Sequence, residues 1–201
     1  MKKLLSFAAL LSLLVFFAGC ETTRVERIDA GTQTDISGYW NDTDVRIVAA
    51  DLIEQVTGAQ WYKDFINENG RKPVVIVGTF RNKSDEHIDT TIISKKLEIA
   101  LVNSGKVKSV AAKNERNEIR KERDEQQLNS SLETAKNIGN ETAADFMLQG
   151  DVKTIVDTNG KISTRTYFVS AELINIETTD KVWLGENAEI KKSIKRPSVR
   201  F

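Results

Sequence analysis

The residue types that carry most enzyme chemistry are scarce in this chain. Its 201 residues include one cysteine, Cys20, and one histidine, His87. A structural zinc site usually takes four nitrogen or sulfur ligands, so these two residues argue against one, and a single cysteine excludes an intramolecular disulfide. Walker A, G-x-S-x-G and G-x-G-x-x-G motifs are absent from the sequence. We therefore expect no catalytic residues and no cofactor.

His87 has acidic neighbours, Asp85, Glu86 and Asp89, which would suit acid–base chemistry or a hard cation. The carboxylates lack the spacing and glycine turn of an EF-hand loop, so no metal site is expected. The simpler interpretation of His87 is a solvent-exposed loop residue. A hydrolase that uses paired carboxylates stays open as an alternative, but the spacing of the 29 acidic residues selects no pair.

Cys20 ends a segment with the layout of a secretory signal. Two lysines precede an apolar run, residues 4–17, that is shorter than the roughly 20 residues of a membrane span. The run closes with Phe17-Ala18-Gly19-Cys20, which resembles the lipobox of bacterial lipoproteins, although leucine is usual at the first position. The resemblance implies that Cys20 carries acyl chains such as palmitate and becomes the new N-terminus. An ordinary signal peptide with a chance cysteine is the alternative.

These features predict three regions: a signal peptide over residues 1–19, the lipidated Cys20 with a short flexible tether over 20–35, and a single globular domain over 36–201. The precursor carries 29 basic and 29 acidic residues, so it has no overall positive charge of the kind typical of nucleic-acid binding, and no nucleic-acid partner is expected. Glu21 follows the cysteine, where an aspartate would resemble an inner-membrane retention signal. We therefore expect an outer-membrane lipoprotein whose domain faces the periplasm.

Hydrophobic spacing predicts the elements of the domain. An amphipathic helix begins at Asp42 or Thr43, and an apolar face continues to a stop at Asn69-Gly70. A buried strand is expected over 73–77, followed by a polar loop over 78–89. The next helix starts at Asp89 or Thr90 and ends at Gly105, before a short strand over 107–111.

The second half of the domain sequence predicts a charged, solvated helix over residues 113–127 and a weak helix over residues 132–143, followed by strands. The strands cover 146–155, residues around 167–173, and 182–190, with turns at Asn159-Gly160 and 177–181. The basic end of the chain is expected to be solvated. This order predicts an α+β fold with one mixed sheet of about four to five strands flanked by helices.

Large aromatic residues stand directly before the first helix. Tyr39 and Trp40 are of the kind that anchors protein interfaces. The alternative is that they fasten the end of the tether onto the domain.

Several stretches, in colinear order over residues 36–192, resemble the LpoB-type activators of penicillin-binding proteins. They are Ser37-Gly38-Tyr39-Trp40-Asn41-Asp42-Thr43-Asp44, Gly70-Arg71-Lys72-Pro73-Val74-Val75-Ile76-Val77-Gly78, Arg81-Asn82-Lys83-Ser84, His87-Ile88-Asp89-Thr90, Asn103-Ser104-Gly105-Lys106-Val107, Ala144-Asp145-Phe146-Met147-Leu148 and Lys181-Val182-Trp183. The resemblance implies a fold like the N-terminal domain of TolB. It also implies an outer-membrane lipoprotein that is not an enzyme.

Such a protein would dock on a small non-catalytic domain of a class A penicillin-binding protein and stimulate peptidoglycan synthesis, and with it cell shape. We expect a monomer that makes this contact through seven candidate residues: Tyr39, Trp40, Asn41, Asp42, Arg81, Asn82 and His87. The alternative is an envelope binding or scaffolding lipoprotein with a different periplasmic partner.

The predicted tether is short for this role. Fifteen residues span at most about 50 Å, whereas enteric members of the family have a much longer tether. Three alternatives follow: the synthase projects outward, the anchor lies in the inner membrane, or the partner is different.

Overall fold

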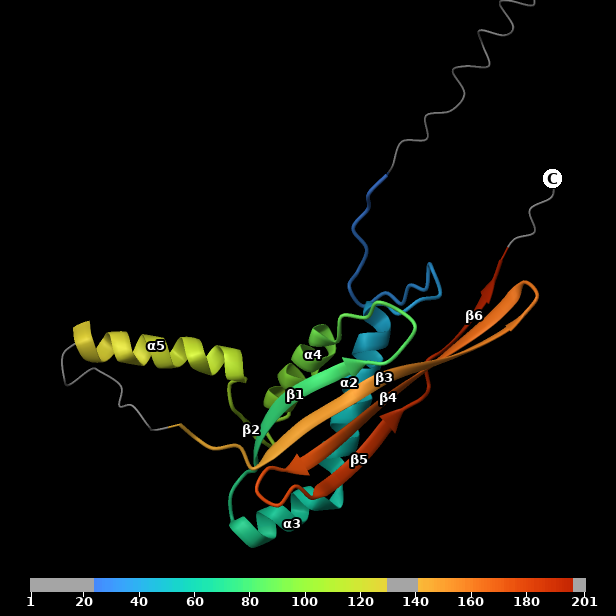
Figure 1. Ribbon diagram of the computed structural model, residues 1–201. Coiled ribbons are helices and arrows are strands. Elements are labelled where there is room, and N and C mark those ends of the chain that lie inside the picture. Colours follow the sequence, from blue (N-terminus) through green and yellow to red (C-terminus); the bar gives the residue numbers. More distant parts are fainter. Residues whose placement is uncertain (1–23, 130–140, 197–201) are drawn as a thin grey trace, which may run out of the picture. The chain divides into compact units, whose positions relative to one another are not determined.

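The computed structural model describes residues 24–129 and 141–196 (Figure 1). The chain divides into two units, Met1–Thr32 and Gln33–Phe201. The described part of the first unit, residues 24–32, contains no helix or strand. The second unit holds the helices α2 (Asp42–Gly58), α3 (Gln60–Asn69), α4 (Thr90–Asn103) and α5 (Lys113–Asn129), and the strands β1 (Val74–Asn82), β2 (Lys108–Ser109), β3 (Phe146–Asn159), β4 (Ile162–Asn175), β5 (Lys181–Asn187) and β6 (Lys191–Lys195).

The strands of the described residues form one mixed sheet in the order β2-β1-β3-β4-β5, and β6 also pairs with β4. Strand β1 is parallel to both β2 and β3, whereas β3, β4 and β5 are antiparallel. The α+β class with a mixed sheet is therefore confirmed. Strand β6 was not predicted from the sequence; it pairs with the first half of β4, beyond the end of β5.

Helices α2 and α4 cover one face of the sheet, and Figure 1 shows them behind the strands. The apolar stripe of α2, with Val48, Leu52 and Val56, is buried as its spacing predicted. Alternate residues of β3 and β4 point toward these helices and are buried: Leu148, Val152, Tyr167, Val169, Ala171 and Leu173. The sheet therefore has one packed face, and the residues between these positions lie on the open face.

Strand β1 is longer than predicted. Its first residues, Val74 to Ile76, are buried as expected, but the strand continues to Asn82, so the prediction of a loop over residues 78–82 is wrong. The pairing with β3 shifts between Val77 and Phe80, and this irregularity lets Phe80 return to the core. The polar sequence that predicted a loop is thus held as a strand by its pairing with β3.

The last predicted strand, over residues 182–190, is instead shorter than expected at its end, because β5 stops at Asn187.

Helix α5 is solvated, as its charge pattern predicted. None of the side chains over residues 115–129 is buried. The weak helix predicted over 132–143 lies mostly outside the described residues, and Ala143 within them is not helical. Among the described helices, none combines the length and the apolar character needed to cross a membrane.

Candidate functional site

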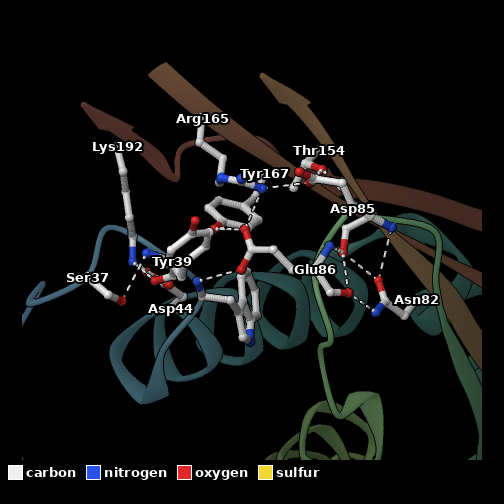
Figure 2. Close-up of polar contacts among 12 residues, drawn as sticks. Ser37, Tyr39, Asp44, Asn82, Asp85, Glu86, Thr154, Arg165, Tyr167 and Lys192 are labelled. Atoms are coloured by element: carbon white, nitrogen blue, oxygen red, sulfur yellow. Dashed lines mark hydrogen bonds and ion pairs between the residues drawn. The ribbon is translucent and has the colours of Figure 1, made fainter. Parts of the chain in front are cut away.

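A largely buried lysine of the last strand binds the segment before α2, residues 34–41, which we call the N-terminal segment. The ammonium of Lys192 on β6 lies 2.6 Å from Asp44 Oδ2 and 2.9 Å from the carbonyl oxygen of Tyr39 (Figure 2). It also lies 2.7 Å from Asp35 Oδ1. Only 9% of its side chain is exposed. The prediction that the basic end of the chain is solvated is therefore wrong for Lys192, because its three partners come from a segment some 150 residues away, whose position the sequence pattern does not reveal.

The two carboxylates on Lys192 differ in their environment. Burial raises the pKa of Asp44 above its ordinary value, and this effect outweighs the opposing hydrogen bond from Lys192. The hydrogen bond from Lys192 lowers the pKa of the exposed Asp35. Lys192 therefore joins an exposed carboxylate of the N-terminal segment to a desolvated one at the start of α2.

Asn41 is the N-cap of α2, not Asp42 or Thr43 as predicted. Its side-chain oxygen accepts hydrogen bonds from the backbone N–H groups of Thr43 and Asp44, and the Asp44 carboxylate accepts one from the N–H of Asn41. This reciprocal pair is a capping box. The Asn41 amide N–H also donates to the carbonyl of Thr34. Both ends of the Asn41 side chain are therefore used in contacts within the domain.

The loop between β1 and α4 meets the N-terminal segment through Glu86. One carboxylate oxygen of Glu86 accepts from the backbone N–H of Trp40 at 3.0 Å, and the other accepts from the Tyr167 hydroxyl at 2.6 Å. The Trp40 ring packs against the Tyr167 ring, with centroids 5.2 Å apart. Burial raises the pKa of Tyr167, as does its hydrogen bond to Glu86, so the hydroxyl keeps its proton.

Arg165 on β4 joins Asp85, Glu86 and Tyr167 in a polar cluster. Its guanidinium lies 2.6 Å from Asp85 and 2.6 Å from Glu86. Hydrogen bonds from Thr154 and Arg165 lower the pKa of Asp85, so its carboxylate stays ionised at neutral pH. Charge pairs thus hold the loop on the sheet, together with the buried side chain of Ile88. Figure 2 shows the charged side chains converging between the loop and the N-terminal segment.

Tyr39 lies over this cluster and faces solvent. The Arg165 guanidinium is 5.0 Å from the centroid of the Tyr39 ring, a cation–π distance. The tyrosine is 46% exposed. Because two carboxylates fix Arg165, the ring of Tyr39 rests on a rigid support while one face of it remains available.

The structure separates the seven sequence-predicted contact residues. Tyr39, Trp40 and Asn41 meet the loop between β1 and α4, and Asn82 holds that loop by accepting from Ser84 and donating to the carbonyl of Glu86. Asp42 and His87 are exposed near these segments. Arg81 is not brought to them, because it stands opposite Asp151 in the backbone register of β1 and β3 and lies on the open face of the sheet.

The open face carries a shallow groove of about 600 Å³ next to Arg81. Most charges along it neutralise one another: Lys83 pairs with Asp151 at 2.8 Å and Lys181 with Glu172 at 2.6 Å. Leu184, which is 66% exposed, lies on the same face. This pattern gives a surface with largely balanced charge and an exposed leucine at its edge.

Sequence reasoning did not single out Lys192, Arg165 or the role of Glu86. Arg165 stands two residues before the core residue Tyr167, so the alternation of the strand places it at an inward position. This placement is the one sequence signal that could have marked Arg165 as a site residue. An inward arginine requires a buried partner, and two acids in a nearby polar loop were available.

The charged groups of this cluster are engaged in contacts within the domain. The carboxylates of the cluster are each paired with a cation or a hydroxyl. Within residues 24–129 and 141–196, no group of three or more histidine, cysteine or acidic side chains could hold a metal ion. The cluster therefore stiffens a surface and presents Tyr39.

A family model described as peptidoglycan-synthase activator LpoB matches residues 44–189. The chain belongs to the LpoB family. Its role within that family is the activation of a peptidoglycan synthase. The matched region runs from the first turn of α2 to just past the end of β5, so it includes Asp44, Glu86 and Arg165 but not β6.

Solved structures of LpoB proteins are similar to the chain at low identity. The C-terminal domain of LpoB from Escherichia coli is 17% identical, with a TM-score of 0.43, over 76% of this chain and 99% of that one. The corresponding domain from Salmonella enterica is 16% identical, with a TM-score of 0.41 and the same coverage. Lipoprotein GNA1162 from Neisseria meningitidis is 13% identical, with a TM-score of 0.36, over 63% of this chain and 88% of that one. Among curated proteins, none matches significantly.

Proposed function

We propose that the chain is a lipoprotein that activates a class A penicillin-binding protein by direct protein contact, with no reaction of its own. Membership of the LpoB family supports this proposal. Activation would be a shift in populations, because a protein that binds an active conformer of the synthase more tightly than an inactive one increases the active fraction. The partner surface would be a non-catalytic docking domain, and the activator would act as a monomer.

The observation that carries the contact surface is the rigid, exposed ring of Tyr39 over Arg165. Aromatic side chains that are already ordered lose little conformational freedom on binding, and they often dominate interface energy. Asp42, at the start of α2, and His87, in the loop between β1 and α4, are exposed and extend this surface. We propose these three as contacts, with Trp40, Asn41 and Asn82 as the residues that shape the surface.

Arg81 stands on the open face, so a contact through it would belong to a second surface. Its guanidinium has no hydrogen bond or ion pair within the described part of the chain, which leaves it available to a carboxylate of a partner. Variants of Tyr39 and Arg81 therefore separate the two surfaces.

The test is a binding and polymerisation assay with the soluble chain, residues 21–201, and purified class A synthases. We expect binding and a faster glycan polymerisation rate. The Tyr39→Ala variant should bind at least about tenfold more weakly, as is usual for a central aromatic anchor. Ile47→Ala, an exposed apolar residue on α2, is the matched control and should bind like the wild-type chain.

A wild-type chain that neither binds nor accelerates any class A synthase would exclude the proposal and favour an envelope scaffold with another partner. A wild-type chain that activates while Tyr39→Ala activates equally well would keep the function and reject the Tyr39 surface. Arg81→Ala in the same assay then shows whether the open face makes the contact.

The anchor proposal places Cys20 at the membrane. Cys20 lies outside the described residues, as do the predicted signal peptide over residues 1–19 and the first residues of the tether. We propose that acyl chains on Cys20 hold the protein in the outer membrane, with the domain in the periplasm. The domain in this scheme is the region from residue 36 onward, and residues 20–35 tether it.

A further inference from the structure

A second groove lies far along the fold from Tyr39, where α3 faces the start of β3 and the turn between β4 and β5 (Figure 1). Its volume is about 770 Å³. Its floor is apolar: Phe65 of α3 packs on the buried Phe146, with ring centroids 5.4 Å apart, and Val182 lies beside them. Ile176, at the turn, is 45% exposed. The groove thus combines a fixed aromatic floor with an apolar side chain in contact with solvent.

The rim of this groove is acidic. Asp64 and Glu68 stand one turn apart on α3, and Glu177 follows Ile176 on the opposite side. All three are exposed, and none of them has an ion pair within the described part of the chain. Like charges that stay unpaired around an apolar floor leave a negative potential there, which attracts cations.

The one cation among the described lining residues is already used. Arg71 donates two hydrogen bonds to Asp145, at 2.7 and 2.8 Å, and its guanidinium lies 5.1 Å from the Phe65 ring centroid. The hydrogen bond from Arg71 lowers the pKa of Asp145 and so keeps this pair ionised. The four carboxylates of the lining therefore face one guanidinium, which neutralises only Asp145.

We propose that this groove binds a basic segment of a partner protein. An apolar side chain of that segment would lie between Phe65 and Ile176, and flanking lysine or arginine residues would pair with Asp64, Glu68 and Glu177. Charge complementarity selects this occupant, because an acidic or neutral segment would leave the three rim carboxylates unpaired. The inference does not rest on the activator proposal. It gives the domain a second contact, so that the protein can join two partners.

The test uses the soluble chain, residues 21–201, labelled with ¹⁵N, and the synthetic peptide acetyl-Gly-Lys-Lys-Leu-Lys-Lys-Gly-amide as the probe. We expect chemical-shift changes confined to α3, the start of β3 and the β4–β5 turn. The peptide with glutamate in place of each lysine should cause none. Because the attraction acts between exposed charges, the affinity for the basic peptide should fall several-fold between 50 and 300 mM salt.

Charge reversal supplies the matched variants. Glu68→Lys combined with Glu177→Lys should weaken the peptide at least about tenfold, whereas Glu118→Lys combined with Glu122→Lys on α5 should leave its affinity unchanged. Both pairs are exposed, so the fold should survive, as an unchanged thermal unfolding curve would show. Replacement of Ile176 by alanine should also weaken the peptide, because the apolar contact becomes smaller.

Three outcomes would overturn the proposal: shifts spread over other elements, equal binding of the acidic peptide, or unchanged binding by the Glu68/Glu177 variant. Self-association is a separate outcome. If the chain alone associates with increasing concentration, and removal of residues 197–201 abolishes this, then the groove takes the C-terminal residues of a second copy, with Arg200, instead.

Discussion

Lys192 Nζ lies 2.6 Å from Asp44 Oδ2, and this contact joins the last strand of the sheet to the first turn of α2. Both side chains are almost completely buried, with 9% and 4% exposed. The pair also holds the segment before α2 in place, because the same ammonium binds Asp35 and the carbonyl of Tyr39. The presentation of Tyr39 therefore depends on a residue that is distant in sequence.

Replacement of Lys192 by methionine should destabilise the domain by about 3–5 kcal/mol, because it leaves Asp44 as an unpaired buried carboxylate. Urea unfolding of the purified chain measures the change. Lys195→Met on the exposed side of the same strand is the control and should stay within about 0.5 kcal/mol of the wild-type chain. The double variant Lys192→Met/Asp44→Asn should recover part of the loss, since the charge is then absent. A single variant as stable as the wild type would contradict this account.

Asn41→Ala should lower the free energy of unfolding by about 0.5–2 kcal/mol, because two backbone N–H groups of α2 lose their acceptor. Asn41→Ser keeps an acceptor oxygen for these N–H groups and adds no charge beside Asp35, so it should cost less. The comparison also tests the role of Asn41 in binding. If Asn41→Ser is stable and still binds a synthase like the wild type, the residue acts through the helix cap and not through direct contact.

Local patterns predicted much of this fold. The stripe of α2, the alternation of Val169, Ala171 and Leu173, and the left-handed Gly70 at the end of α3 follow from periodicity and residue preference. Each of these signals lies within one element, so the sequence around it is sufficient. The family resemblance came from the same short stretches.

The remaining features depend on pairing between distant segments. Strand β6 has the sequence Lys-Lys-Ser-Ile-Lys, which reads as a solvated tail, and it becomes a strand because β4 offers a free edge. The extension of β1 to Asn82 depends on β3 in the same way. In the candidate site, Tyr39 and Trp40 were predicted, but their support by Arg165 and Glu86 was not, since it requires the topology that brings loop, strand and N-terminal segment together.

Gly38→Ala should destabilise the N-terminal segment. Gly38 has a φ of +75°, and a Cβ at this position would lie 2.5 Å from Ile194 Cγ1 on β6. We expect faster amide exchange over the segment 34–41 and over β6, with little change in α4. Gly70→Ala is the control, because it shares the positive φ but meets open space, so its effect should stay at the end of α3. Equal exchange in wild type and Gly38→Ala would rule out this contact.

Cys20→Ala should release the protein from membranes in cell fractionation, because acyl chains on this residue are the proposed anchor. Phe17→Leu, which restores the usual first residue of the lipobox, should remain membrane-bound and serves as the control. A Cys20→Ala chain that still fractionates with the outer membrane would show that another contact holds it there.

The pair of Arg71 and Asp145 should make stability depend on pH in the acid range. The hydrogen bond from Arg71 lowers the pKa of Asp145 in the folded state below its ordinary value of 3.8. As the pH falls, the unfolded chain therefore binds the proton first. The stabilisation is complete above the ordinary pKa and is lost as the pH falls through the folded one.

The measurement is urea unfolding of wild type and Asp145→Asn between pH 7 and the acid limit of the fold. Asp145→Asn keeps an oxygen that can accept from the N–H of Val74, but it loses the charge that holds Arg71. We expect the variant to be less stable at pH 7, with a difference that narrows as the pH falls below about 4. Asp124→Asn, at an exposed position on α5, should leave the pH profile unchanged. A difference for Asp145→Asn that stays constant with pH would mean that the carboxylate stabilises the fold by its hydrogen bonds alone and not by its charge.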